Sequence, residues 1–408
     1  MTEYKRKGKD YLNAEKFATL EETVERLREH WRPCPDTETV PLPRAAGRIA
    51  AKTLTSLHNH PVVRAAQADG IAVRSADFAA GPPDTSNWRE GRDYVPADMG
   101  DDFDDAFDMV INIEKVRFDA DGVIHLEPEE EARSGLRVRP SGETLREGEE
   151  VLAAGVRINP FQVGLLAGGG VNEVPVLARP RVSYIPTGGE LVPPGRPLQR
   201  GQTVESNGLM IAATLAAWQA DFQPLPIIDD QKAELEKALD KALAESDLVL
   251  INGGSSMGCE DHVSGMLARR GGFFQHGVRA IPGMPMGVAV IDGKPVINIP
   301  GPPFAAFCGL DWCVKPLIAH WYGQPCLKRR TVRARLTKPL RKPERFAFFS
   351  RLHLSKDSGL AWQAEPIRFE ERYAPSFSRF NALIIMPVGC ELIEAGEEIE
   401  AEILYTES

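Results

Sequence analysis

Residues Asn252 to His262 read NGGSSMGCEDH, and they combine glycines with hydroxyl, thiol, carboxyl and imidazole groups. Gly253, Gly254 and Gly258 would let the backbone approach a ligand closely, and N–H groups that precede a helix can cradle an anion. Because no lysine follows, the stretch is not a Walker A loop. Taken alone it is weak evidence for a ligand, since tight strand-to-helix turns use glycine routinely.

The second half of this stretch, Cys259 to His262, contains four residue types that can bind metals. Four consecutive side chains cannot all converge on one ion, and zinc ligands are usually spaced along the chain. We therefore expect His262 to face solvent, and Asp261 either to cap the following helix or to contact a ligand. A helix N-terminus can lower the pKa of a thiol such as that of Cys259, although most such thiols are inert.

The length, composition and net charge of the chain argue against several classes of protein. The chain has 408 residues, of which 43% are hydrophobic, so two to four domains with sizeable cores are expected. The net charge of −10 disfavours a general nucleic-acid binder. No window approaches the roughly 18 apolar residues of a membrane span, and the charged N-terminus does not read as a secretory signal. Because the six cysteines include no C-x-x-C pair, reduced thiols in the cytoplasm are expected.

Strands and helices alternate over about 180–325, which predicts a doubly wound parallel sheet. Three glycine- or proline-rich loops follow expected strands, at 186–195, 252–258 and 300–305. Since the carboxyl ends of parallel strands meet at one edge, these loops predict a ligand-binding edge.

The remaining sequence predicts other kinds of secondary structure. Helical patterns are expected near 17–31 and from 143 to 170, a small β-rich lobe over 61–139, and a barrel or sandwich over 327–408. Six aspartates between 98 and 108 are expected to form a solvated loop rather than a dedicated metal site.

Five short motifs, in order, resemble the molybdenum-insertion proteins of molybdenum-cofactor synthesis, the MoeA family or gephyrin E-domain type. The family patterns S-A-M-D-G-Y-A-V, S-T-G-D-E-L-V, D-S-N, S-G-G-V-S-V-G-D-Y-D and P-G-N-P-V-S-A are similar to AQADGIAV (66–73), PTGGELV (186–192), ESN (205–207), NGGSSMGCED (252–261) and PGPPFAA (300–306). The resemblance covers nearly the whole chain.

The resemblance implies a multidomain α/β and β fold. Its parts would be an elongated helical dimerisation segment (1–60 and 140–178), a small β-rich lobe (61–139), an α/β molybdopterin-binding domain (179–326) and a C-terminal β-barrel (327–408). It implies a homodimer whose cleft lies between the α/β domain of one subunit and the β lobe of the other. Further cofactor-synthesis proteins or a recipient molybdoenzyme are additional candidate partners, and neither nucleic acid nor a membrane is expected.

The implied reaction accepts adenylylated molybdopterin and molybdate, places the metal on the dithiolene and releases AMP, with Mg²⁺ involved. Motif matching assigns catalysis and cation binding to Asp69, Glu190 and Asp261. It assigns contacts with the molybdopterin to Thr187, Gly188, Asn207, Gly253, Gly254, Ser255, Ser256, Gly258, Pro300, Gly301 and Pro303.

The departures from the family pattern share a direction, because they remove charged and hydroxyl groups and keep the residues that shape the backbone. The replaced positions are Ala66, Ala68, Ile71, Met99, Thr144, Gly189, Cys259, Ile281, Met284 and Pro302. Two family lysines become Ile281 and Met284, which removes charge that would stabilise an oxyanion, and the neighbouring Arg279 is a candidate substitute. Three functions therefore stay open: an active molybdenumtransferase, an impaired paralogue that carries molybdopterin or the finished cofactor, and a dimeric scaffold without a ligand.

Overall fold

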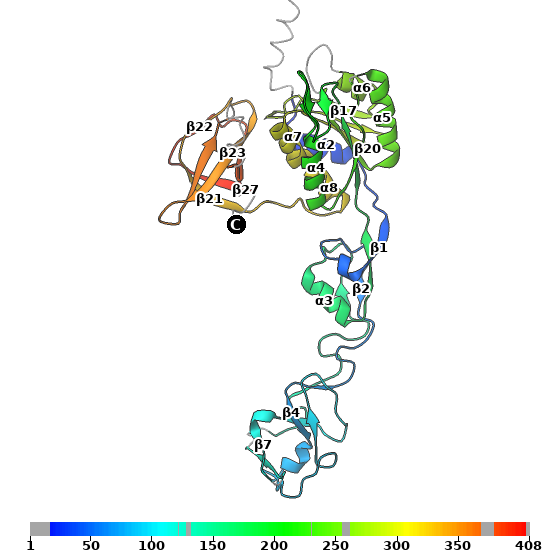
Figure 1. Cartoon of the computed structure of the whole chain (residues 1–408), viewed down its shortest axis with the longest axis vertical. Coiled ribbons are helices and arrows are strands. Elements are labelled where there is room, and N and C mark those ends of the chain that lie inside the picture. Colours follow the sequence, from blue (N-terminus) through cyan, green and yellow to red (C-terminus); the bar gives the residue numbers. More distant parts are fainter. Residues whose placement is uncertain are drawn as a thin grey trace, which may run out of the picture. The chain divides into compact units, whose positions relative to one another are not determined.

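The computed structural model describes residues 17–120, 122–127, 132–229, 231–254, 262–368 and 379–404. The chain forms two compact units (Figure 1). One unit comprises Thr37–Leu177, and the other joins the residues up to Asp36 with those from Ala178 onward. Among the described residues, no helix is long and apolar enough to cross a membrane.

A six-stranded sheet forms the centre of the larger unit, in the order β15-β12-β16-β20-β19-β17. The first four strands in this order are parallel, and β16 is buried along its whole length, as expected for a sheet covered on both faces. The strands are β12 (Arg181–Pro186), β15 (Asp221–Pro224), β16 (Leu248–Asn252), β17 (Phe273–His276), β19 (Gly287–Ile291) and β20 (Lys294–Ile299). The predicted doubly wound α/β domain is confirmed.

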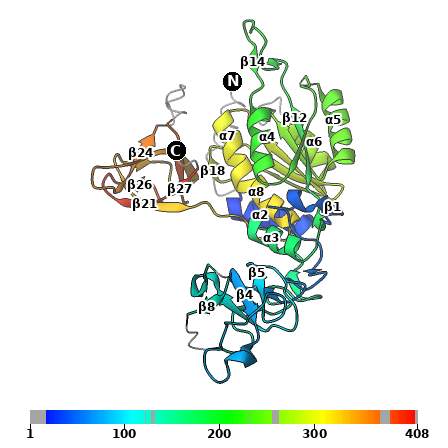
Figure 2. The ribbon, with the colours of Figure 1, turned by 60° about the horizontal axis from the view of Figure 1, so that its bottom comes forward.

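Helices cover both faces of this sheet. Helices α5 and α6 pack on one face, and α4 and α7 pack on the other (Figures 1 and 2). The core between α5, α6 and the sheet contains Leu239, Val249 and Met266. The bounds of the helices are α4 (Asn207–Ala217), α5 (Lys232–Glu245), α6 (His262–Arg270), α7 (Pro303–Gly309), the π-helical turn η5 (Leu310–Val314) and α8 (Lys315–Trp321).

One side of the sheet differs from an all-parallel arrangement, because β19 runs antiparallel to both of its neighbours. β19 and β20 form a hairpin through Asp292 and Gly293, whose φ angles are +50° and +74°. An Asp-Gly pair with two positive φ angles is typical of the tight turns that join antiparallel strands.

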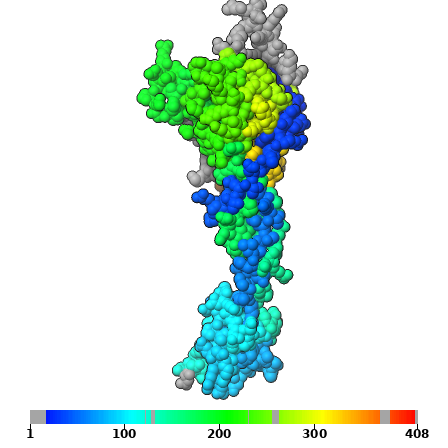
Figure 3. All heavy atoms as spheres, turned by 90° about the vertical axis from the view of Figure 1, so that its right-hand side faces the viewer, coloured from blue at the N-terminus to red at the C-terminus, as the bar shows by residue number. Residues whose placement is uncertain are grey.

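Helix α2 (Leu20–His30) begins with a capping box, in which Glu22 N donates to Thr19 Oγ1 and Thr19 N donates to Glu22 Oε2. The resemblance places this stretch in the dimerisation segment. In the structure the helix packs on η5, α8 and β19 of its own chain, and Figure 3 shows its blue surface beside the yellow surface of the later helices. Its buried side chains include Leu20, Val24 and Leu27.

The predicted C-terminal barrel is also confirmed. Five strands close in the order β23-β24-β21-β27-β25, with β25 pairing back onto β23. Strand β18 (Ala280–Ile281) pairs in parallel with β23, and β22 (Leu340–Arg341) pairs with β26 (Leu392–Ile393). The barrel strands are β21 (Thr331–Leu336), β23 (Ala347–Lys356), β24 (Trp362–Ile367), β25 (Ala382–Met386) and β27 (Glu398–Ile403).

Arg329 links the π-helical turn η5 to the barrel strand β27. Its guanidinium binds Asp311 through two parallel hydrogen bonds of 2.7 and 2.5 Å, and it also contacts Glu402 at 3.2 Å. The side chains of Arg329 and Asp311 are only 16% and 9% exposed, so this fork is largely desolvated.

We expect Arg329→Lys to lower the free energy of unfolding by about 1–2 kcal/mol, because lysine cannot make both bonds to one carboxylate. Urea denaturation would measure this change. Arg333→Lys is the control, because the ion pair of Arg333 with Glu398 is exposed and 3.7 Å long. Equal effects of the two substitutions would contradict a special role for the buried fork.

The smaller unit contains more strand and less helix than the sequence predicts. Within this unit, the part of the predicted helical segment at 37–60 and 140–177 contains one α-helix, α3 (Pro160–Gly168), and two strand pairs. Gly148 and Gly155 adopt φ angles of +79°, which end any continuous helix before Pro160. The paired strands are β1 (Thr37–Pro41) with β11 (Glu173–Leu177) and β2 (Leu54–Thr55) with β10 (Glu150–Leu152).

The predicted β-rich lobe is present in this unit. Its central sheet has the order β5-β4-β6, and two further strand pairs flank it. Three single turns, η2 (Leu42–Arg44), η3 (Ser75–Phe78) and η4 (Ile113–Lys115), connect strands of the unit. The strands of the lobe are β3 (Ala65–Ala66), β4 (Gly70–Val73), β5 (Tyr94–Ala97), β6 (Met109–Asn112), β7 (Val116–Phe118), β8 (Ile124–Leu126) and β9 (Val138–Arg139).

Candidate functional site

The order of the strands identifies one position at the carboxyl edge of the sheet. After β12 the chain passes through α4 to β15 on one side, whereas after β16 it continues through α6 to the strands on the other side. The strand order therefore reverses between β12 and β16. In open α/β sheets, the crevice outside the carboxyl ends of two such strands is the usual ligand site.

The loops that follow β12 and β16 are bonded to each other at this position. Thr187 N donates to the Asn252 carbonyl at 2.9 Å, and the Thr187 hydroxyl reaches the same oxygen at 3.3 Å. Gly188 N donates to Ile228 O, and Gly253 N donates to Ile299 O. The backbone donors of Thr187, Gly188 and Gly253 thus hold neighbouring loops together.

Gly253 and Gly254 allow this close approach. Their φ angles are +114° and +59°. A Cβ atom on Gly253 would lie 2.5 Å from the carbonyl oxygen of Thr187, and one on Gly254 would lie 2.6 Å from Cγ2 of Val263. Side chains therefore cannot enter either position without moving the turn.

A buried hydrogen-bonded network lies beneath this edge. Asn252 Nδ2 donates to Pro300 O at 2.8 Å, and Asn252 Oδ1 accepts from Asn207 Nδ2 at 2.9 Å. Asn207 Nδ2 also donates to Gly301 O at 2.7 Å. Asn252 therefore joins the three predicted loops, because its carbonyl accepts from Thr187 N and its side chain bonds to Pro300 O and to Asn207 at the start of α4.

Tyr184 and Glu205 extend the network. The Tyr184 hydroxyl lies 2.8 Å from Asn252 Oδ1 and 2.9 Å from Glu205 Oε1, and Glu205 Oε1 also accepts from Gly208 N. Burial, together with the Glu205 carboxylate, raises the pKa of Tyr184 above its ordinary value, so its phenol stays neutral. Glu205 occupies the acidic position of the D-S-N pattern, and its carboxylate caps α4.

The described carboxylates do not form a ready cation site. Glu190 is exposed beside the Thr187–Gly188 turn, and Asp69 lies in the other unit, where its Oδ1 accepts from Met99 N at 2.7 Å. No group of three His, Cys, Asp or Glu side chains gathers for a metal anywhere in the described parts of the chain.

Asp229 was not singled out by sequence reasoning, yet it lies at the place of a missing acid. The family pattern has an acid where this chain has Gly189. The Asp229 Oδ1 atom lies 2.8 Å from the position that a Cβ of residue 189 would take. The pairing of Thr187 with Ile228 brings the two loops together. The aspartate pair at 229–230 after a strand is the signal that could have identified it.

In the turn after β20, the carbonyl groups of Pro300 and Gly301 accept hydrogen bonds from the buried asparagines, and few N–H groups are left to bind a ligand. Pro302 and Pro303 have no N–H, and Pro303 begins α7. Gly301 is exposed, and its carbonyl holds Asn207. Pro302 replaces a family asparagine, so this turn keeps its shape without that side-chain amide.

The loop that lacks the family lysines is bound to the barrel. β18 pairs with β23, and Arg279 Nε donates to Arg345 O at 2.8 Å. This bond directs the Arg279 guanidinium toward the barrel backbone. Ser255, Ser256, Gly258 and Asp261, which the sequence also assigns to the site, lie outside the described residues, as does the replaced position Cys259.

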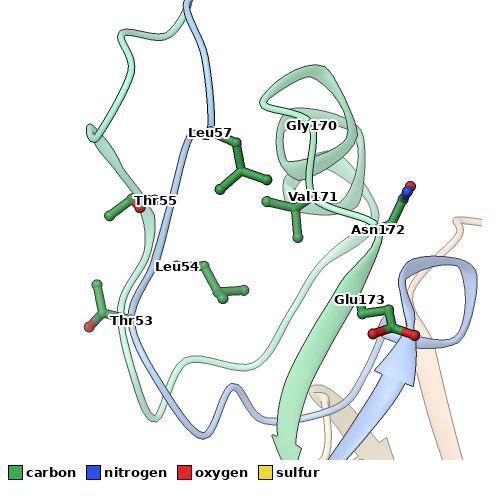
Figure 4. Close-up of a pocket in the computed structure, with 8 residues that line it drawn as sticks. All are labelled: Thr53, Leu54, Thr55, Leu57, Gly170, Val171, Asn172 and Glu173. Carbon is green, nitrogen blue, oxygen red and sulfur yellow. The ribbon is translucent and has the colours of Figure 1, made fainter.

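A separate open pocket of about 670 Å³ lies in the smaller unit (Figure 4). The side chains of Leu54, Leu57 and Val171 point toward one another across it, whereas those of Asn172 and Glu173 point away. None of the predicted site residues lines this pocket. None of its lining residues is a lysine or an arginine, so it offers no positive charge to a phosphorylated ligand.

Two family models match the chain. Residues 18–170 match the MoeA N-terminal region (domain I and II), and residues 183–320 match a probable molybdopterin binding domain. The second match contains β12, β16, β20 and the three loops that follow them.

Relatives match over most of the chain. Molybdopterin molybdenumtransferase 2 of Mycobacterium tuberculosis is 30% identical over 384 residues, which cover 89% of this chain and 94% of the relative. Molybdopterin molybdenumtransferase of Haemophilus influenzae is 29% identical, with 84% and 83% covered. The crystal structure of the molybdopterin biosynthesis MoeA protein of Pyrococcus horikoshii has a TM-score of 0.77 and 27% identity, covering 96% of this chain and 100% of that one.

Proposed function

Because the chain belongs to the MoeA family of molybdopterin molybdenumtransferases, we propose that it binds adenylylated molybdopterin and inserts molybdate to form the molybdenum cofactor, releasing AMP. The observation that carries this proposal is the edge at the switch point of the sheet. There, Asn252 and Asn207 join the loops after β12, β16 and β20. This network is present although several charged residues of the family pattern are replaced in this chain. Molybdopterin and molybdate are the substrates in this account.

The residues at this edge divide into two roles. Thr187, Gly188 and Gly253 shape the turn, because their N–H groups already donate to neighbouring loops. In this proposal the donors for the phosphates are Gly254 and the sequence-assigned Ser255, Ser256 and Gly258. A backbone turn before a helix suits this task, since α6 begins at His262.

The proposal assigns Mg²⁺ to Glu190, with Asp261 and Asp69 as the further sequence-assigned ligands. Mg²⁺ is commonly held by one or two carboxylates together with substrate phosphates. An edge with few described carboxylates therefore fits a Mg²⁺ ion that is bound together with the substrate. The homodimer, the inter-subunit cleft and the four-part division of the chain also remain parts of the proposal.

Turnover by the purified protein tests the function. We expect molybdate and adenylylated molybdopterin to yield AMP and a cofactor that reactivates an apo-molybdoenzyme. Binding of molybdopterin without AMP release would instead identify a carrier. If neither binding nor turnover occurred, the chain would be a scaffold and the proposal would be wrong.

Glu190→Gln tests the cation site. We expect it to raise the Mg²⁺ concentration for half-maximal turnover about 10-fold, because a neutral amide is a poorer ligand for a hard cation. Glu245→Gln is the control, because Glu245 is also exposed but is the last residue of α5, at the edge of the sheet where β16 begins. A shift of the same size in both variants would show that Glu190 acts only through general surface charge.

A further inference from the structure

Asn207 has a buried acceptor that nothing in the described structure uses. The residue is 6% exposed and begins α4, which has 11 residues. Its Nδ2 donates to Asn252 Oδ1 and to Gly301 O, which uses both hydrogens of the amide. Its Oδ1 has no hydrogen-bond partner among the residues that the structure describes.

Two backbone carbonyls determine which way this amide faces. Exchanging the oxygen and nitrogen of Asn207 would place Oδ1 against Gly301 O, so that two acceptors would face each other at 2.7 Å. Asn252 is oriented in the same way, because its Nδ2 donates to Pro300 O. Its Oδ1 must then face Asn207, and the two assignments support each other.

We propose that Asn207 Oδ1 accepts a hydrogen bond from an N–H or O–H group of the bound molybdopterin, such as a nitrogen of its pterin ring. This inference rests on the proposed function and makes it more specific. A fully ionised phosphate offers only acceptors, so Asn207 cannot bind one through Oδ1. Asn207 therefore selects a donor of the ligand, and the phosphate lies elsewhere on the edge.

The position of Asn207 supports this assignment. It lies in the network that joins the loops after β12, β16 and β20, at the point where ligands of open α/β sheets bind. A buried acceptor without a partner is costly, so a ligand that supplies a donor gains affinity there. An ordered water is the competing partner, because buried waters also satisfy such groups.

The test compares two ligands that differ only in the phosphate. Dissociation constants would be measured by calorimetry for molybdopterin and for molybdopterin dephosphorylated by a phosphatase, with the wild type and with Asn207→Ala. We expect the substitution to weaken both ligands by the same factor, about 10-fold. Asn172→Ala, an exposed asparagine in the other unit, should leave both values unchanged.

The outcomes separate the inference from the function. Weakening of intact molybdopterin alone would assign Asn207 to the phosphate and overturn the inference, and no change in either ligand would assign the position to water. Failure of the wild type to bind either ligand would overturn the proposed function as well. Should Asn207→Ala unfold, a crystal structure of the wild-type complex decides. We expect a ligand nitrogen or hydroxyl within hydrogen-bond distance of Oδ1, and a phosphate or only water there would contradict the proposal.

Discussion

Replacing Gly253 by alanine is expected to reduce affinity for molybdopterin about 100-fold, because the turn that carries the phosphate donors must move. The new Cβ would lie 2.5 Å from both the carbonyl oxygen and Oγ1 of Thr187, and φ is +114°. Strain of this kind costs about 1–3 kcal/mol before the clash is counted. Calorimetric titration and thermal unfolding of the variant would measure the two effects.

Gly195 provides the matched control for this substitution. It also has a positive φ, of +85°, but nothing lies within 4 Å of its Cβ position. Gly195→Ala should therefore show backbone strain without displacement of the turn, and it should leave affinity nearly unchanged. If Gly195→Ala and Gly253→Ala weakened binding equally, the close approach of residue 253 to Thr187 would not explain the loss of affinity in Gly253→Ala.

Replacing Asn252 by alanine is expected to lower the free energy of unfolding by about 2–4 kcal/mol, because it leaves several buried polar groups unpaired. Asn252 is 5% exposed, and it bonds to Pro300 O, Asn207 Nδ2 and the Tyr184 hydroxyl. Without it the Asn207 amide loses one of its two restraints, so molybdopterin affinity should also fall more than 10-fold. Chemical denaturation and ligand titration of one preparation would give both numbers.

Ser183 provides the control for Asn252, because it is a buried polar residue outside the hydrogen-bonded network. Its residue is 1% exposed, and its hydroxyl has no hydrogen-bond partner within the described chain. Ser183→Ala should be neutral or slightly stabilising, since no bond is lost. A large loss of stability in Ser183→Ala, or none in Asn252→Ala, would contradict the importance assigned to the network.

Much of the edge could be predicted from sequence, because turns leave local signals. Glycine and proline after apolar runs identified the loops that contain Thr187, Gly253 and Gly301, and strand–helix alternation predicted that they share one edge. The reversal of strand order between β12 and β16 has no local signal, since it depends on which strands pair.

The residues that hold the edge together could not be recognised in the same way. Tyr184 and Asn252 read as ordinary members of two strands, and their importance comes from hydrogen bonds between residues 68 positions apart. Asp229 approaches the position of Gly189 only because the loop after β15 pairs with the turn after β12. The π-helical turn η5 likewise interrupts what reads as one long helix.

The most direct test of the central claim is hydrogen–deuterium exchange of the wild-type protein with and without molybdopterin, because bound ligand slows exchange of the amides that it protects. The account predicts slower exchange in peptides that cover 186–192, 252–261 and 300–304, which contain the three loops at the switch point. Protection confined to 53–57 and 170–173, around the open pocket of the other unit, would contradict it.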